Sequence, residues 1–382
     1  MRIAIINATG GGMSGGYRVY LKNILPRLAA HSAIDAVFCA SPATLKMESW
    51  FETLPKTTFV SGEPFRFMRH KPDCNLQQTV AKFAPDVVFI PVERYLFIPN
   101  TPLVTMVQNM GPLVPRVKYN PLSEKTRYIL QRHEAKFALK KADRVIAPSN
   151  FVRDFLVNKW KINPEQVVVI HYGATVIDNS VLTQRSVVIP AGWEGRFLFT
   201  AGSIEPYRGL EDIFMALQQI IKQNKTSGLV IAGFARQNMM AYQEKLKKWI
   251  QRHGLDSKIV WTGALSTEEM SWCYQNSRVF IMTSRVESFS IISLEAMAHG
   301  CVCIAADNPP LPEIFTQAAR YYPPGNGKSL ADCLTEVLML SKEDRAAIQR
   351  RARDRANNFS WDENVQKLVM TFCQAIDSHL KV

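Results

Sequence analysis

The chain has 382 residues, a length that predicts two or three domains with ample hydrophobic cores. Hydrophobic residues make up 47% and charged residues 21%, as in ordinary soluble globular proteins, and no stretch approaches the roughly 18 apolar residues of a membrane span. The seven cysteines contain no C-x-x-C pair, and the seven histidines show no H-x-H or H-E-x-x-H spacing. The sequence therefore indicates neither a disulfide framework nor a metal site.

The amino terminus begins with a short apolar run that ends at Ile6, and polar Asn7 and a glycine cluster follow it at once. This run is too short for a signal peptide. We therefore expect a cytoplasmic protein.

Positive charge is concentrated in the first half of the chain. Residues 1–190 hold 24 Lys and Arg against 13 Asp and Glu, a net +11, whereas residues 191–382 hold 22 against 20, a net +2. A positive field of this size predicts an anionic partner for the first half. No nucleic-acid recognition motif or basic stripe with interleaved aromatic residues is present, so an anionic membrane or a lipid-phosphate acceptor fits better than nucleic acid.

The first half alternates strand and helix patterns, which indicates a doubly wound parallel sheet. The expected strands cover residues 2–8, 36–40, 86–91, 103–108, 144–147 and 167–171. The glycine cluster Gly10–Gly16 separates the first strand from a helix with one apolar face. Its backbone N–H groups could bind a phosphate, but a flexible turn explains it equally well, because no P-loop or dinucleotide fingerprint is present.

Two later segments of this half are also open to more than one interpretation. Gln108 and Asn109 end a strand just before Pro112, where they fit either a ligand contact or a plain turn. The predicted helix over residues 123–144 carries cations that would be either solvated or membrane-facing, namely Lys125, Arg127, Arg132, Lys136, Lys140 and Lys141. Residues 173–190 show no strong period, and we expect an interdomain linker there.

A second α/β series begins near Arg196, with strands expected over residues 197–201, 229–232, 259–262, 279–283 and 302–305. The stretch SRVESFSIISLEAMAHG, residues 284–300, follows the fourth of these strands and reads as a tight loop and a helix that ends at Gly300. Glu287 lies in the expected loop, and Glu295 lies about one turn into the helix. Carboxylates at this position suit sugar and ribose hydroxyls, although a solvated loop acid and an ordinary helix acid would give the same spacing.

The whole stretch resembles the E-x7-E signature of glycosyltransferase family 4, whose members use the GT-B fold. The matching residues are Glu287, Ser288, Phe289, Glu295-Ala296-Met297-Ala298 and Gly300, while Ser290 stands where the family usually has glycine. The segment Ala201–Leu210 resembles the family's strand-end motif, in which two cations hold the donor diphosphate. Arg208 matches the second cation, and Ser203 stands at the place of the first.

The resemblance implies a role for each matching residue. Gly15 and Gly16 match the glycine pair that faces the donor pyrophosphate, and Gln108-Asn109 stands where many members have a sugar-facing His-Asp pair. Glu295 would bind the ribose and Glu287 the transferred sugar, with Arg208 and Glu287 as the catalytic residues. The remaining residues expected to bind the donor are Ser203, Ser288, Phe289, Ser290 and Ile291.

We therefore expect an α/β protein with the GT-B fold, in which two Rossmann-like domains face one another across a cleft. Residues 1–185 would bind the acceptor and residues 186–360 the donor, and a helix over residues 361–382 would pack back on the first domain. The implied reaction is retaining hexosyl transfer from a nucleotide-diphosphate sugar to a glycan or lipid-linked glycan of cell-surface polysaccharide synthesis. No metal or cofactor is expected, no nucleic acid partner is expected, and contact with an anionic membrane would be peripheral, at its inner face.

Other classes of protein share parts of this pattern. A nucleotide-sugar epimerase or hydrolase of the same fold would act on the donor without an acceptor. An NAD-dependent oxidoreductase would need a dinucleotide fingerprint and a ribose acid, which this sequence lacks. A sugar-binding protein without catalytic activity is the third alternative.

Overall fold

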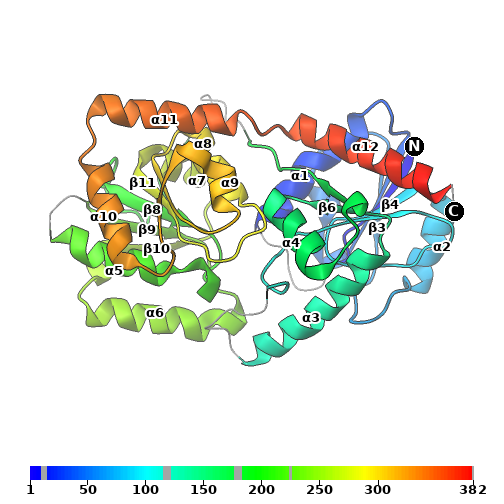
Figure 1. The fold of residues 1–382 in the computed structure, drawn as a ribbon, viewed down its shortest axis with the longest axis horizontal. Helices are drawn as coiled ribbons and strands as arrows, with labels where there is room; N and C mark the ends of the chain where they lie inside the picture. Colours follow the sequence, from blue (N-terminus) through cyan, green and yellow to red (C-terminus); the bar gives the residue numbers. More distant parts are fainter. Residues whose placement is uncertain (10–14, 115–121, 176–182, 223–225, 381–382) are drawn as a thin grey trace. The chain divides into compact units, whose positions relative to one another are not determined.

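The computed structural model describes residues 1–9, 15–114, 122–175, 183–222 and 226–380. They form two compact units, drawn in Figure 1. The first unit contains the described residues up to Gly173 and those from Ser360 onward, and the second contains the described residues of Ala174–Phe359. The division thus falls after Gly173, whereas the sequence analysis placed it after residue 185.

The described part of the first unit contains a seven-stranded parallel sheet with the order β3-β2-β1-β4-β5-β6-β7. The chain moves outward from β1 to β3, returns to β4 on the other side of β1, and then moves outward again. The direction of winding therefore reverses between β1 and β4. The strands are β1 (Arg2–Ile6), β2 (Ala36–Ser41), β3 (Thr57–Ser61), β4 (Val87–Ile90), β5 (Leu103–Met106), β6 (Arg144–Ala147) and β7 (Val167–Val169).

Helices connect these strands, and several of them begin at a side chain that caps the first turn. Asp73, Ser149 and Ser360 each accept a hydrogen bond from a backbone N–H group in the first turn of the following helix. The α-helices of this unit are α1 (Gly15–Ala30), α2 (Cys74–Phe83), α3 (Leu122–Lys141), α4 (Asn150–Trp160) and α12 (Trp361–His379). Short 3-10 turns cover Ala43–Leu45, Met47–Trp50 and Pro164–Gln166.

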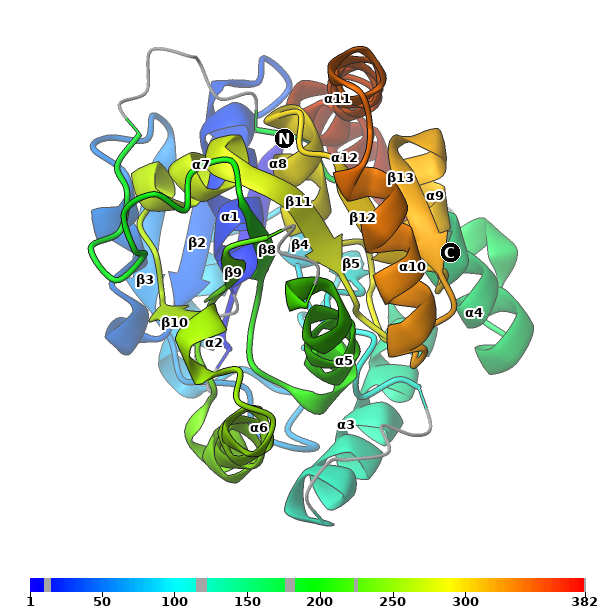
Figure 2. The same ribbon diagram turned by 90° about the vertical axis from the view of Figure 1, so that its left-hand side faces the viewer.

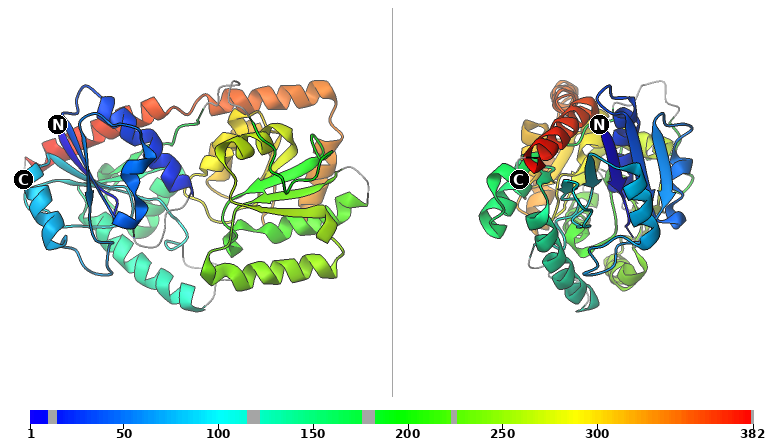
Figure 3. Two further views of the ribbon diagram at one scale, coloured as in Figure 1. Left: turned by 180° about the vertical axis from the view of Figure 1, so that it is seen from behind. Right: turned by 90° about the vertical axis from the view of Figure 1, so that its right-hand side faces the viewer.

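The carboxyl-terminal helix α12 belongs to the first unit and packs beside α1 (Figure 3). Gly173 allows a close approach there, because a Cβ at this position would lie 2.3 Å from the backbone nitrogen of Trp361. The Asn364 side chain donates to the carbonyl of His171 at 2.6 Å, and the rings of Phe372 and Phe89 lie 5.3 Å apart. These contacts attach the end of the chain to the first sheet.

The described part of the second unit contains a six-stranded parallel sheet with the order β10-β9-β8-β11-β12-β13. The strands are β8 (Phe197–Ala201), β9 (Gly228–Ala232), β10 (Ile259–Gly263), β11 (Ser277–Met282), β12 (Cys303–Ala306) and β13 (Ala319–Tyr322). Figure 2 shows helices on both faces of this sheet, which is why its central strands β8, β11 and β12 are apolar and buried. Here the winding direction reverses between β8 and β11.

The α-helices of the second unit are α5 (Leu210–Ile221), α6 (Met240–Arg252), α7 (Thr267–Asn276), α8 (Ile291–Ala298), α9 (Leu311–Phe315), α10 (Gly327–Leu338) and α11 (Lys342–Ala356). Short 3-10 turns cover Pro206–Arg208, Gln237–Met239, Asp256–Lys258 and Thr316–Ala318. Helix α7 begins with a capping box, in which the side chains of Ser266 and Glu269 accept hydrogen bonds from each other's backbone N–H groups. Helix α8 ends as expected, because Gly300 adopts a left-handed φ of +71° just after it.

Two features of the fold differ from the sequence-based expectation. The edge strands β3 and β13 were not predicted, because both are short and only partly buried and so lack a clear apolar run. Residues 183–190, expected within a linker, pack on the second unit instead. Ile189 is fully buried, and the Gln184 N–H donates to the Glu268 carbonyl at 3.4 Å.

Candidate active site

The candidate site lies at the carboxyl ends of β8 and β11 in the second unit. These strands are neighbours, and the chain leaves them in opposite directions, so a crevice forms where their two loops diverge. We call residues 202–209 the β8 loop and residues 283–290 the β11 loop. Open α/β sheets bind ligands at such reversal points.

The two loops are held together through their backbones. The Arg285 N–H donates to the Tyr207 carbonyl at 2.7 Å, and the Thr283 hydroxyl donates to the Arg208 carbonyl. Gly209 makes this contact feasible, since its φ is +65° and a Cβ there would lie 2.7 Å from the Thr283 carbonyl oxygen. The relative position of the loops is therefore fixed by the main chain, which suits a preorganised site.

Arg208 projects from the β8 loop toward the β11 loop. Its Nη1 donates to Oε1 of Glu287 at 2.5 Å and to the Ser284 hydroxyl at 3.1 Å. Both charged side chains are largely buried, with 18% of Arg208 and 12% of Glu287 exposed. Burial by itself lowers the pKa of Arg208, but Glu287 and the nearby Tyr207 and Glu205 outweigh it, so that the pKa is raised and the guanidinium stays charged.

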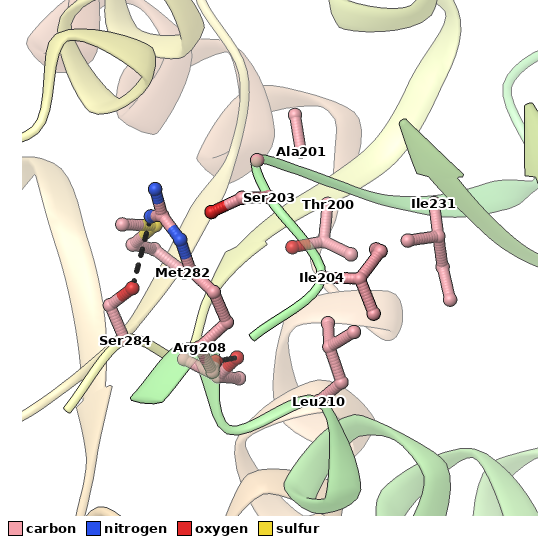
Figure 4. A pocket seen from close by; sticks show the side chains of 11 residues that line it. Thr200, Ala201, Ser203, Ile204, Arg208, Leu210, Ile231, Met282 and Ser284 are labelled. Atoms are coloured by element: carbon pink, nitrogen blue, oxygen red, sulfur yellow. Dashed lines mark hydrogen bonds between the residues drawn. The ribbon is translucent and has the colours of Figure 1, made fainter. Parts of the chain in front are cut away.

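A small pocket lies beside Arg208 (Figure 4). Arg208, Ser203 and Ser284 line it together with apolar residues at the ends of β8 and β11. Gly202 leaves room for the arginine, because a Cβ there would lie 3.0 Å from the Arg208 guanidinium carbon. Ser203 contributes only a hydroxyl, 3.4 Å from that of Tyr207, so Arg208 is the cation of this pocket lining.

Glu295 lies in α8 and is held by Tyr274 of α7. The Tyr274 hydroxyl donates to Oε2 of Glu295 at 3.0 Å. Burial raises the pKa of Glu295 to about 7, and the hydrogen bond from Tyr274 acts in the opposite direction. His299 packs against the same tyrosine, with ring centroids 4.9 Å apart. Sequence reasoning missed Tyr274, because no local spacing connects it with Glu295.

The other residues expected to bind the donor in the β11 loop and at the start of α8 are buried. Phe289 is fully buried and packs edge-on against Phe359, with ring centroids 5.7 Å apart, so its side chain belongs to the core. Ser288 and Ile291 are also buried. Ser290 adopts a φ of +100°, a conformation that favours glycine, and its hydroxyl lies 2.7 Å from that of Ser293. This strained residue immediately precedes the first turn of α8.

A buried carboxylate, Asp212, holds the β11 loop through Arg285. Asp212 of α5 is fully buried and accepts hydrogen bonds from the Arg285 side chain at 2.9 Å, the Tyr322 hydroxyl at 3.0 Å and the Gly325 N–H at 2.9 Å. These hydrogen bonds compensate the negative charge of the buried Asp212 carboxylate. They also fix the side chain of Arg285, two residues before Glu287. Asp212 is a positioning residue that the sequence analysis did not find.

The first unit places Gln108 and Asn109 just after β5. Glu93, which follows β4, accepts hydrogen bonds from both of their backbone N–H groups, at 2.5 and 2.7 Å. Burial raises the pKa of Glu93. The side-chain amide oxygen of Gln108 accepts a hydrogen bond from the Tyr172 hydroxyl at 3.1 Å, and that of Asn109 accepts one from the Gly111 N–H at 2.8 Å. The strand-end turn is thus built by these side chains.

Gly15 and Gly16 form the first turn of α1 and are exposed, whereas the sequence analysis expected them just before the helix. The other glycines of that cluster, Gly10–Gly12, lie outside the described residues. Among the residues that the structure describes, no group of three or more His, Cys, Asp or Glu side chains could hold a metal ion. Within the same residues, no helix is long and apolar enough to cross a membrane.

The fold is shared with solved glycosyltransferase structures. Anabaena HepE in complex with UDP-glucose superimposes with a TM-score of 0.75 at 18% identity, over 98% of this chain and 100% of that one. Two parallel Rossmann-like sheets with the strand orders given above define the GT-B class of proteins.

The sequence comparisons identify the family. The model described as "Glycosyltransferase Family 4" matches residues 14–176, and the model described as "Glycosyl transferases group 1" matches residues 189–355. The two models together cover most of the chain, which belongs to glycosyltransferase family 4.

Two curated relatives are similar over part of their length. A GDP-mannose:cellobiosyl-diphosphopolyprenol alpha-mannosyltransferase of Xanthomonas oryzae pv. oryzae is 28% identical over 145 residues, 38% of this chain and 37% of that protein. A D-inositol 3-phosphate glycosyltransferase of Streptomyces bingchenggensis is 24% identical over 254 residues, 63% of this chain and 55% of that protein. The match thus spans about half or less of either relative.

Proposed function

We propose that this chain transfers a hexosyl group from a nucleotide-diphosphate sugar to an acceptor hydroxyl, with retention of configuration at the anomeric carbon. The observation that carries the proposal is the buried pair of Arg208 and Glu287 at the reversal point of the second sheet. Two similar proteins support it, because the Xanthomonas protein is named for GDP-mannose and HepE was solved with UDP-glucose.

Arg208 meets the main electrostatic demand of this reaction. When the bond between the anomeric carbon and the diphosphate oxygen breaks, its electron pair stays on the diphosphate, whose negative charge grows. A preorganised guanidinium in a partly buried site stabilises that charge without a metal. The amino-terminal end of α8, which begins at Ile291, adds a second source of positive potential through the helix dipole. The reaction then needs neither a bound metal nor a cofactor.

Glu287 acts on the sugar. The bound diphosphate offers Arg208 a new anionic partner, so the Glu287 carboxylate is released from the pair and can accept hydrogen bonds from the sugar's hydroxyls. It also stabilises the positive charge that develops at the anomeric carbon. The acceptor oxygen forms the new bond to that carbon, and its proton passes to the leaving diphosphate.

Glu295 recognises the ribose of the donor. A carboxylate accepts hydrogen bonds from both ribose hydroxyls, and Tyr274 fixes its orientation. The backbone groups of residues 288–291 and of Gly15 and Gly16, together with Ser203, complete the donor contacts in this proposal. The donor would thus bind mainly to residues 186–360.

The acceptor would bind to residues 1–185, where Gln108 and Asn109 contribute hydrogen bonds. We propose a glycan or lipid-linked glycan of cell-surface polysaccharide synthesis. The Xanthomonas relative is named for a diphosphopolyprenol-linked acceptor, and the net charge of +11 on residues 1–190 would attract such an anion. The protein would act in the cytoplasm, peripherally at the inner face of the membrane.

One experiment separates transfer from the epimerase or hydrolase alternative. The donor is incubated with and without acceptor lipid, and nucleoside diphosphate release and glycosylated product are both measured. Turnover that requires the acceptor supports transfer, whereas equal turnover without it favours hydrolysis or epimerisation. We do not retain the NAD-dependent oxidoreductase or the non-catalytic sugar-binding protein, because both matched family models describe glycosyl transferases.

A further inference from the structure

Three segments of the first unit meet around His70. The His70 ring stacks on Phe137 of α3, with centroids 4.5 Å apart, and Tyr95 packs edge-on against both rings at 5.8 and 5.6 Å. The Phe97 N–H donates to the His70 carbonyl at 2.6 Å. The loop between β3 and α2, the segment after β4, and helix α3 therefore build one continuous surface.

This surface exposes an unusual amount of apolar side chain. The exposed fractions are 49% for Phe67, 55% for Met68, 50% for Phe97 and 36% for Phe137. Ile129 and Leu130 of α3 add 51% and 43%, and Leu130 lies two helical turns before Phe137 on the same side. We call the surface made by these six residues the α3 face. Large apolar side chains gathered in this way mark a binding surface.

Positive charge dominates around the α3 face. The two acids of α3, Glu124 and Glu134, are only 4% and 3% exposed and pair with Arg127 and Arg94. The exposed side of the helix therefore carries cations without acids, among them Lys125, Lys136, Lys140 and Lys141. The loop before α2 adds Arg66, Arg69 and Lys71, against the single exposed acid Glu63, which pairs with both arginines.

The three cations of that loop also line a small pocket, which reaches the end of the first sheet. Arg66, Arg69 and Lys71 share its lining with the acids Glu63 and Asp73, so the cations of the lining exceed its acids by one. Ala8, which follows β1 closely, also lines the pocket. The Phe65 N–H donates to the Ala8 carbonyl at 2.7 Å, so the loop is attached to the carboxyl end of that strand. An anionic group bound among these cations would thus lie beside the edge where a Rossmann-like sheet binds ligands.

The composition of the α3 face fits one kind of partner best. Phenylalanine and aliphatic side chains flanked by lysine and arginine insert at the boundary of headgroups and acyl chains, while the cations bind lipid phosphates. Protein interfaces, by contrast, are depleted in lysine. We infer that the α3 face binds the surface of an anionic bilayer, with the pocket of Arg66, Arg69 and Lys71 holding a headgroup phosphate. This inference does not depend on the proposed transfer reaction.

Cosedimentation of the full chain with vesicles tests the inference. Vesicles of phosphatidylcholine mixed with phosphatidylglycerol are compared with pure phosphatidylcholine vesicles at low and physiological salt. The expected result is salt-sensitive binding to the mixed vesicles only, because the attraction is screened over about 8 Å at physiological ionic strength. Lys136→Glu/Lys140→Glu should weaken binding by at least about tenfold, since each cation near an anionic surface contributes about a fivefold gain in affinity.

A second variant tests the apolar part. Phe67→Ser/Met68→Ser changes two exposed side chains without touching the His70 stack, and it should also reduce binding severalfold. The matched controls lie in the second unit: Lys248→Glu/Arg252→Glu reverses two exposed cations one turn apart on α6, and Met339→Ser removes a 70% exposed side chain. Both controls should bind vesicles as the unmodified chain does, and all variants should keep its melting temperature.

Failure of vesicle binding can be distinguished from failure of the proposed transfer reaction. Donor turnover with a water-soluble acceptor should be the same in all of these variants, because none of the changed residues belongs to the candidate active site. No binding to mixed vesicles at low salt, or equal binding by the α3-face variants and the controls, would overturn the inference. Self-association or RNA binding lost only in the α3-face variants, without vesicle binding, would overturn it as well.

Discussion

Arg208 and Glu287 are 79 residues apart in the sequence, yet Nη1 of the arginine lies 2.5 Å from Oε1 of the glutamate. The contact joins the loops that follow β8 and β11 and cancels two charges in a largely buried place. In the proposed reaction these two groups have different partners, because the arginine binds the diphosphate and the glutamate binds the sugar. In the proposed function, the pair is therefore the resting state of the site, and donor binding exchanges one anionic partner of Arg208 for another.

This exchange gives a specific prediction for Glu287→Gln. The neutral amide no longer competes for Arg208, so the affinity for a nucleoside diphosphate should stay the same or increase. At the same time kcat should fall, because the variant lacks the carboxylate that stabilises charge at the anomeric carbon. Calorimetry with the nucleoside diphosphate and steady-state kinetics measure the two quantities. Equal losses in affinity and kcat would mean that Glu287 serves only ground-state binding.

If Glu295 binds the donor as proposed, donor binding should depend on pH. Its pKa is raised to about 7 by burial, so a large part of the side chain is protonated below that pH and cannot accept bonds from both ribose hydroxyls. Donor affinity should therefore increase as the pH rises from about 6 to about 8, and Glu295→Gln should weaken binding and remove most of this dependence.

Tyr274→Phe provides the matched variant for this residue. It removes the hydroxyl that stabilises the Glu295 carboxylate, so the midpoint of the pH dependence should move upward. Titrating donor into the three proteins at several pH values gives both the affinity and the midpoint. A pH profile that is identical in all three would exclude Glu295 as the titrating group.

Ser290 should tolerate glycine better than a branched side chain. Its φ of +100° is strained for any residue with a Cβ, and glycine relieves that strain, while the lost hydrogen bond to Ser293 offsets part of the gain. The free energy of unfolding of Ser290→Gly should remain within about 1 kcal/mol of the unmodified chain, whereas Ser290→Val should lose about 1 to 3 kcal/mol. Urea unfolding measures both, and equal stability of the two variants would contradict this reading of the loop.

Much of the fold could be predicted from the sequence because interior parallel strands are continuous apolar runs. The strands β8, β11 and β12 were expected within one or two residues of their observed positions. The edge strands β3 and β13 could not be found in this way, because a partly exposed edge strand does not need to be a continuous run of apolar residues. The position of Gly300 was predictable, since a helix end with a left-handed φ selects glycine locally.

The candidate site was predictable only where its residues lie in local motifs. Glu287, Glu295 and Arg208 were expected from such motifs, but their partners Ser284 and Tyr274 were not assigned. The same holds for Asp212, which bonds Arg285 across 73 residues, and for Glu93, which supports Gln108 across 15. Contacts of this kind depend on the topology of the sheet, and no periodicity in the sequence encodes them.

The role of Arg208 as the stabiliser of the leaving diphosphate is the central claim, and the rate of sugar transfer measured in EDTA tests it most directly. Arg208→Ala should lower kcat by roughly a hundredfold or more, the scale of losing one preorganised stabiliser of developing charge. Lys248→Ala, which removes an exposed cation of α6, serves as the control and should leave kcat unchanged. The unmodified chain should keep its activity in EDTA. Activity that disappears in EDTA and returns with Mg²⁺, together with a nearly unchanged kcat for Arg208→Ala, would contradict the account.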